Sequence, residues 1–192
     1  MKPDNGKNLM LKSGVSLIVF MVFMAVGVAQ AQVSITYSSR GQQYFSINIP
    51  DNWRVNVGSE THPSQASEGR REPARLVSAM PGDGVPLWFG LWVPEHLEKI
   101  EDAEKFMASL GLHLLDDVIV TDRKFDALHS MGVYRVGGTG KKEGEPMDFR
   151  AAFLQLSPEN VVIAIYIGPR ETTINYGQEL KQIIDSLQPI TR

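Results

Sequence analysis

The stretch "NVVIAIYIG", Asn160 to Gly168, decides the fold class because it is almost wholly apolar. A strand with one face in water alternates apolar and polar side chains, whereas a strand covered on both faces can be apolar throughout. The turn sequence "SPEN" runs directly into this stretch, as expected at the start of a strand. The sequence therefore predicts a central strand in a sheet that is covered on both faces.

Further strands are indicated by alternation of apolar and polar residues. In "YFSINIP", Phe45, Ile47 and Ile49 share one face, and Pro50 ends the strand. The same pattern recurs in residues 53–57, 74–80, 86–94, 116–122, 130–136 and 147–156.

Two segments instead repeat apolar residues at helical spacing. They are residues 95–110, with Gly111 placed as a C-cap, and residues 171–187. The order strands, helix, strands, helix predicts an α+β fold: a single domain with an antiparallel sheet flanked by two main helices.

The segment "RVGGTGKKEGEP", residues 135–146, has the composition of a phosphate-binding loop. A Walker-type loop needs G-x-x-x-x-G-K-[ST] between a strand and a helix. Here a second lysine follows Gly140-Lys141, and Arg135 stands where the first glycine is needed. A dinucleotide motif fails as well, because Glu143 takes the place of its third glycine. The segment is predicted to be the tip of a long hairpin, and no cofactor is expected.

The N-terminus has the pattern of a secretory signal peptide. Three lysines precede an uncharged run of 14 residues, 15–28, and Ala29 and Ala31 satisfy the small-residue rule for cleavage. The run is shorter than the roughly 18 residues of a spanning helix. We therefore expect residues 1–31 to be removed, leaving a periplasmic or secreted chain that begins at Gln32.

The mature chain, residues 32–192, is long enough for one domain with a substantial core. It would carry 16 basic and 21 acidic residues, a net charge of −5. This balance gives no electrostatic reason to bind nucleic acid. The absence of cysteine from the chain excludes disulfides, thiolate catalysis, cysteine metal sites and a lipid-modified cysteine.

Few residues suggest catalysis. The four histidines lack H-E-x-x-H spacing, and no serine has the spacing of a nucleophile motif. Neither a catalytic residue nor a metal site is predicted, so we expect the protein not to be an enzyme. The alternative is an envelope hydrolase or metal-dependent enzyme, which would need His96, Glu95 and Glu98, or the cluster at Asp116, to converge on a pocket.

Partner binding is the leading hypothesis, with a protein or peptide of the cell envelope as the partner. Trp88 and Trp92 share one face of their predicted strand and could form apolar contacts. Arg70 and Arg71 lie in a polar loop, where they could anchor a partner. The remaining alternative, a carrier of a small molecule or lipid, would need a cavity beside the apolar strands.

The run "YFSINIPDNWRV" and the C-terminal run "NVVIAIYIGPRETTINYGQELKQIIDSLQPI" resemble the two ends of PsbP-like domains. This family includes the photosystem protein PsbP, the Ran-binding Mog protein and bacterial envelope proteins such as DcrB. The resemblance implies an antiparallel sheet flanked by helices and an accessory or binding role. DcrB-like lipoproteins carry a cysteine after the leader, where this chain has Gln32, so no stable membrane anchor is expected after cleavage.

Overall fold

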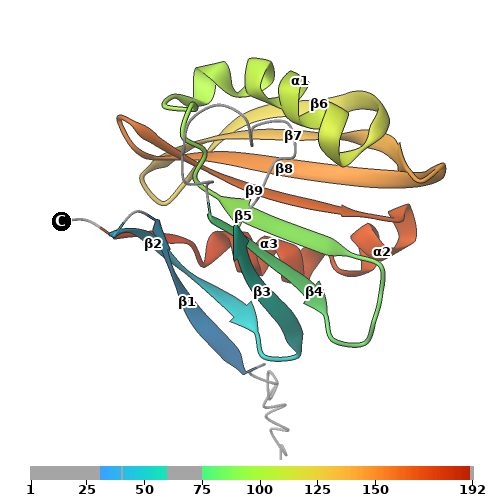
Figure 1. The fold of residues 1–192 in the computed structure, drawn as a ribbon, viewed down its shortest axis with the longest axis horizontal. Helices are drawn as coiled ribbons and strands as arrows, with labels where there is room; N and C mark the ends of the chain where they lie inside the picture. Colours follow the sequence, from blue (N-terminus) through green and yellow to red (C-terminus); the bar gives the residue numbers. More distant parts are fainter. Residues whose placement is uncertain (1–30, 40, 60–74, 191–192) are drawn as a thin grey trace, which may run out of the picture.

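A computed structural model describes residues 31–39, 41–59 and 75–190. Its main layer is an antiparallel sheet with the strand order β3-β4-β5-β9-β8-β7-β6 (Figure 1). The strands are β3 (Trp53–Ser59), β4 (Arg75–Pro81), β5 (Trp88–Trp92), β6 (Asp116–Leu128), β7 (Met131–Lys142), β8 (Glu145–Ser157) and β9 (Asn160–Gly168).

Strand β9 lies at the centre of this sheet, between β5 and β8. Its residues from Val161 to Ile167 are all buried, although they point alternately to opposite faces. The prediction of a central strand covered on both faces is confirmed.

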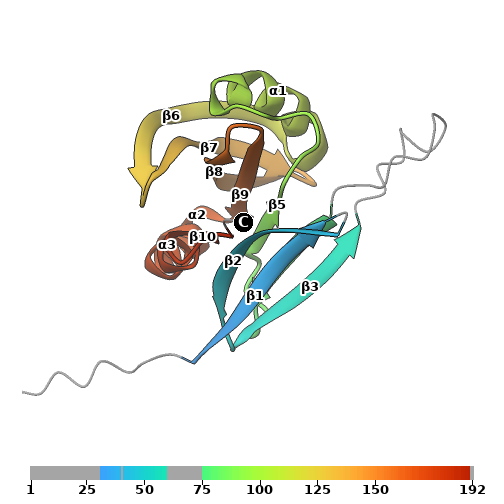
Figure 2. The same cartoon turned by 90° about the vertical axis from the view of Figure 1, so that its left-hand side faces the viewer.

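The two faces of the sheet are covered by different elements. Helix α1 (Ala103–Leu114) lies over one face, which we call the α1 face, and α2 (Arg170–Asn175) and α3 (Gly177–Asp185) lie on the other, the α3 face (Figure 1). A second, smaller sheet with the order β1-β2-β10 lies on the same side as α3 (Figure 2).

The small sheet consists of β1 (Gln32–Ser39), β2 (Gln42–Pro50) and β10 (Gln188–Pro189). It is joined to its surroundings by hydrogen bonds as well as by its apolar side chains. The Tyr37 hydroxyl donates to the Arg75 carbonyl at 2.7 Å, and the Asn48 amide donates to Ser186 Oγ at 2.9 Å. Strand β1 was not among the predicted strands.

The glycine-rich segment forms the β7–β8 hairpin, as predicted. Its turn residues, Glu143 and Gly144, have φ angles of 54° and 86°. Two consecutive positive φ values are the signature of a two-residue type I′ turn, which matches the twist of the paired strands. The segment therefore joins two strands of the sheet.

The first helix differs from the prediction. Residues 95–99 are irregular, a short 3-10 turn spans Ile100–Asp102, and Gly111 lies inside α1 instead of capping it. Gln155 on β8 provides the physical reason. Its side chain accepts from the Ile100 amide at 3.0 Å and donates to the Glu98 carbonyl at 2.6 Å, which holds this backbone out of a helix.

The second predicted helix is divided in two. The break falls at Tyr176, with φ −90° and ψ 0°, and is followed by Gly177, a weak helix former. The Tyr176 hydroxyl donates to Asp83 Oδ2 at 2.8 Å, which ties the break to the β4–β5 turn. The sheet is therefore flanked by three α-helices in the described ranges, rather than by two main ones.

Candidate functional site

Helix α1 packs on the sheet less closely than α3 does. The apolar residues of α3 and the leucine just beyond its end are at most 5% exposed: Leu180, Ile183, Ile184 and Leu187. On α1, Ala103 is fully buried, whereas Phe106, Met107 and Leu114 are only partly buried, and the side chains of residues 109–113 lie outside the description. Met107 and Leu114 border unfilled space above the α1 face of the sheet.

The larger part of this space, the β6 hollow, lies between α1 and strands β6 and β7. Its volume is about 520 Å³, within the range of small-molecule sites. Its walls combine apolar side chains with a polar rim. They include Met107, Leu115, Val118, Val120 and Val136 as well as Glu104, Asp116, Asp117, Arg123 and Tyr134.

A second hollow, the Trp88 hollow, opens at the other side of α1 and has a volume of about 320 Å³. Except for one lysine, its lining is apolar: Met80, Pro86, Leu87, Trp88, Leu114, Met147, Ile167 and Lys142. A narrow space of about 20 Å³, the waist, shares Met107 and Val118 with the β6 hollow and Leu114 and Ile167 with the Trp88 hollow. The three spaces form one line beneath α1, which we call the trough.

Trp88 forms a wall of the trough in an unusual way. A Cβ atom added to Gly90 would lie 2.2 to 2.9 Å from atoms of the Trp88 ring. The indole therefore lies flat across Gly90, along the sheet, and needs a glycine beneath it. This arrangement keeps the ring low enough for the space above it to remain open.

Polar contacts hold the N-terminal part of α1 to the sheet at the β6 hollow. The Tyr134 hydroxyl donates to Glu104 Oε1 at 2.5 Å, and Arg123 Nε donates to the same oxygen at 3.0 Å. The hydrogen bond from Tyr134, together with the Arg123 charge, lowers the pKa of Glu104. Burial and the Glu104 carboxylate raise the pKa of Tyr134 to about 12. Tyr134 is therefore a neutral donor, and Glu104 an ionised acceptor, at ordinary pH.

Charged residues line both hollows of the trough, and some of them are already paired. At the β6 hollow, three carboxylates face one lining arginine, and Lys141 pairs with Asp117 at 2.8 Å from outside the lining. At the Trp88 hollow, Lys142 is the lining residue with a charge, and it has no ion pair within the described ranges. Two of the three carboxylates therefore have a basic partner, and the register, which sets Asp116 opposite Lys141, places the third near Lys142.

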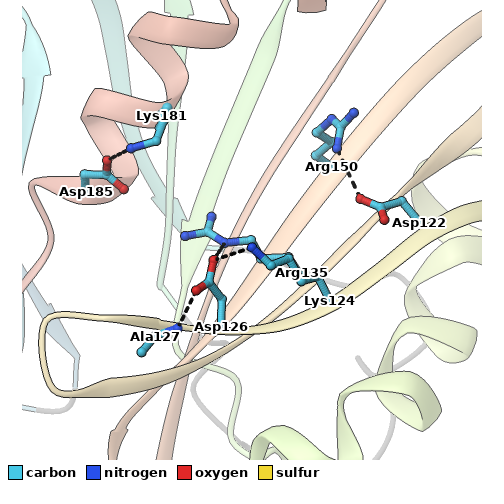
Figure 3. A network of polar contacts seen from close by, with 8 residues as sticks. All are labelled: Asp122, Lys124, Asp126, Ala127, Arg135, Arg150, Lys181 and Asp185. Atoms are coloured by element: carbon cyan, nitrogen blue, oxygen red, sulfur yellow. Dashed lines mark hydrogen bonds and ion pairs between the residues drawn. The ribbon is translucent and has the colours of Figure 1, made fainter.

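The α3 face offers a contrast, because its uncovered part over β6, β7 and β8 is charged (Figure 3). Arg150 pairs with Asp122 at 3.5 Å, and Arg135 pairs with Asp126 at 3.6 Å. On the neighbouring helix, Lys181 pairs with Asp185. These charges neutralise one another across the surface, so the apolar opening belongs to the α1 face.

The residues predicted to bind a partner have separate locations. Trp88 lines the trough, whereas Trp92, on the same side of β5, is 4% exposed in the core. Arg70 and Arg71 lie outside the described residues. The partner-binding role of all four stays a prediction.

Sequence reasoning missed Glu104, Tyr134, Val118 and Lys142 as lining residues. These residues come together because α1 packs against β6 and β7, and the spacing of the residues in the sequence does not reveal that packing. The alternative hypothesis of a metal site can be compared with the structure. Across residues 31–39, 41–59 and 75–190, no group of three or more His, Asp or Glu residues could hold a metal ion.

The described helices can be compared with the length and hydropathy of a membrane-spanning helix. In the part of the chain that the structure describes, no helix is long and apolar enough to cross a membrane. The predicted leader, residues 1–31, falls almost entirely outside the described residues, so its prediction stands as made.

Comparisons with known proteins bear on the fold. No protein-family model and no curated protein sequence matches the chain. The solution structure of cyanobacterial PsbP (CyanoP) from Synechocystis sp. PCC 6803 matches with a TM-score of 0.59 at 7% identity, over 86% of this chain and 96% of that one. The chain therefore has a PsbP-like fold, as the sequence resemblance implied. The narrower likeness to Mog and DcrB stays a prediction.

Two further solved structures are similar. LpqN, described as involved in cell envelope biogenesis of Mycobacterium tuberculosis, matches with a TM-score of 0.49 at 12% identity, over 84% of this chain and 91% of that one. A Pseudomonas aeruginosa protein of unknown function matches with a TM-score of 0.48 at 14% identity, over 83% of this chain and 99% of that one.

Proposed function

We propose that the protein is a non-enzymatic binding protein of the cell envelope that holds an apolar ligand in the trough beneath α1. The single observation that carries this proposal is the incomplete seating of α1. Hollows of about 520 and 320 Å³ flank a helix on which Phe106, Met107 and Leu114 stay partly exposed. A helix with only a structural role gains stability by burying such side chains, as α3 does.

The lining supports binding rather than chemistry. Small-molecule sites are mostly apolar with a few polar groups at defined places, and the trough has this composition. Glu104 and Tyr134 have pKa values shifted away from neutral pH, downward for the acid and upward for the phenol. Such groups are poor general acids or bases at pH 7, where catalysis favours pKa values near the operating pH.

The proposed location in the envelope rests on the leader pattern of residues 1–31. For the binding function, the competing hypothesis is a protein partner. A partner would contact Trp88 and the loop that carries Arg70 and Arg71. The trough favours a small ligand instead, because its volume suits one and its waist is too narrow for a folded surface to enter.

The test uses an uncharged, environment-sensitive dye, N-phenylnaphthylamine, titrated with the purified protein. We expect saturable fluorescence enhancement, which Val118→Trp should weaken by about tenfold or more, equivalent to about 1.4 kcal/mol. Val118 is 37% exposed and lines both the β6 hollow and the waist, so an indole there fills space without disturbing the core.

The matched control is Ile119→Trp, the next residue on β6, which is 62% exposed and lines none of the three spaces. It should leave dye binding unchanged. Equal loss in the two variants, or no saturable binding by the unaltered protein, would contradict the proposal. A specific envelope protein captured by crosslinking, and retained by Val118→Trp, would then favour the partner hypothesis.

A further inference from the structure

We propose that the ligand of the trough is a free fatty acid: a long, unbranched acyl chain whose carboxylate lies at Lys142 and whose chain runs beneath α1 toward Tyr134. This inference rests on the proposed function and specifies its ligand. It follows from the shape of the trough and from Lys142, a lining residue without an ion pair in the described ranges.

The shape favours a thin, linear molecule. The proposed path runs from Lys142 to Tyr134, which lie eight residues apart on β7, or about 27 Å along the strand. Midway, the waist of about 20 Å³ is scarcely larger than the space that one water molecule occupies. A ring system of several fused rings would be stopped there, whereas an alkyl chain needs only a small movement of its walls.

Side chains at the waist and in the neighbouring Trp88 hollow can move aside for an alkyl chain. Met107 lines both the waist and the β6 hollow, and Met147 lines the Trp88 hollow. Methionine is unbranched and flexible, so it adapts to a chain that passes beside it. Leu114, the last residue of α1, is only partly buried and has room to shift outward.

The charges orient the chain. Lys142 stands at the rim of the Trp88 hollow without an ion pair in the described ranges, although Glu145 lies opposite it in the β7–β8 register. In the β6 hollow, Glu104 already pairs with Arg123 and Asp117 pairs with Lys141, so neither basic group is free for a ligand carboxylate. An anionic head group is therefore favoured at Lys142, with the tail beneath α1.

The experiment measures displacement of the neutral dye by octanoate, laurate, myristate and palmitate. Each methylene buried in the trough should strengthen binding by about fourfold, because it removes apolar surface from water. This gain should stop once the chain fills the trough. The contrast between anionic and cationic head groups comes from hexadecylamine, which has the palmitate chain length and the opposite charge, and which should bind more weakly.

The variant Lys142→Gln should weaken palmitate about three- to fivefold, as expected for one exposed ion pair, and leave the dye unaffected. Lys142→Arg should retain binding. Lys105→Gln, at an exposed position on α1 outside the trough lining, is the matched control. Equal binding of palmitate and hexadecylamine, or equal effects of the two glutamine variants, would overturn the inference.

The two proposals fail differently. If the dye binds and Val118→Trp blocks it, but no fatty acid displaces the dye, the trough is a ligand site and its ligand is not a fatty acid. If the dye itself does not bind and the fatty acids do not bind either, the proposed function fails together with this inference.

Discussion

The contrast between α1 and α3 gives the sharpest stability prediction. Ile183→Ala on α3 removes a side chain that is 2% exposed, and it should lower the free energy of unfolding by about 3 kcal/mol, because lost burial and a closed cavity both contribute. Met107→Ala on α1 should cost about 1 kcal/mol or less. Its side chain is partly exposed and already borders two hollows, so truncation opens no new closed cavity.

Urea unfolding followed by far-UV circular dichroism measures both values, with the slope checked for two-state behaviour. For a chain of this size, the Ile183→Ala loss corresponds to a fall in Tm of about 6 to 12 °C. Similar losses in the two variants would mean that α1 is seated as firmly as α3. That result would refute the reasoning that leads to the trough.

Further predictions concern single contacts and the leader. Tyr134→Phe should raise the pKa of Glu104 toward its usual value, as measured by NMR titration. Because the folded-state pKa is lowered, the contact stabilises the fold fully above the unfolded pKa of about 4.3. This stabilisation is lost as the pH falls through the folded-state pKa. Gly138→Ala should lower the free energy of unfolding by about 1 to 3 kcal/mol, because the added methyl group would overlap the β6 backbone and the Phe149 ring. Gly177→Ala has open space around the added methyl group, so it should leave stability unchanged or raise it by up to about 1 kcal/mol. Mass spectrometry of the exported protein should find Gln32 as the first residue, and an intact N-terminus would contradict the predicted leader.

The sequence was informative where local pattern and tertiary environment agree. The apolar run of β9 requires cover on both faces, and the β7–β8 turn requires residues that accept positive φ, so both were predictable. The start of α1 was not, because Gln155, more than fifty positions away, holds the backbone before it in an irregular path. No local pattern encodes such a long-range hydrogen bond.

The candidate site was harder to predict, since it depends on how well two surfaces fit. In sequence, the apolar stripes of the two predicted helices look alike. Only the structure shows that the stripe of α3 is buried, whereas Phe106, Met107 and Leu114 of α1 are only partly buried. Trp88 was singled out because it shares a face of its predicted strand with Trp92, but its flat position over Gly90 depends on the register of β5, which the alternation of residues does not specify.

The trough follows from how unequally the two faces of the sheet are covered. Seven strands make a sheet about 29 Å wide, from six spacings of about 4.8 Å. On the α3 face, two helices and a second sheet share the cover (Figure 2). On the α1 face, the described cover includes a helix of 12 residues, about 18 Å long and about 10 Å across, and the segment 95–102 that precedes it. A cover of that size does not seal so wide an apolar surface. The space beside it is therefore a consequence of the topology, and an apolar ligand would complete the layer that the chain leaves unfinished.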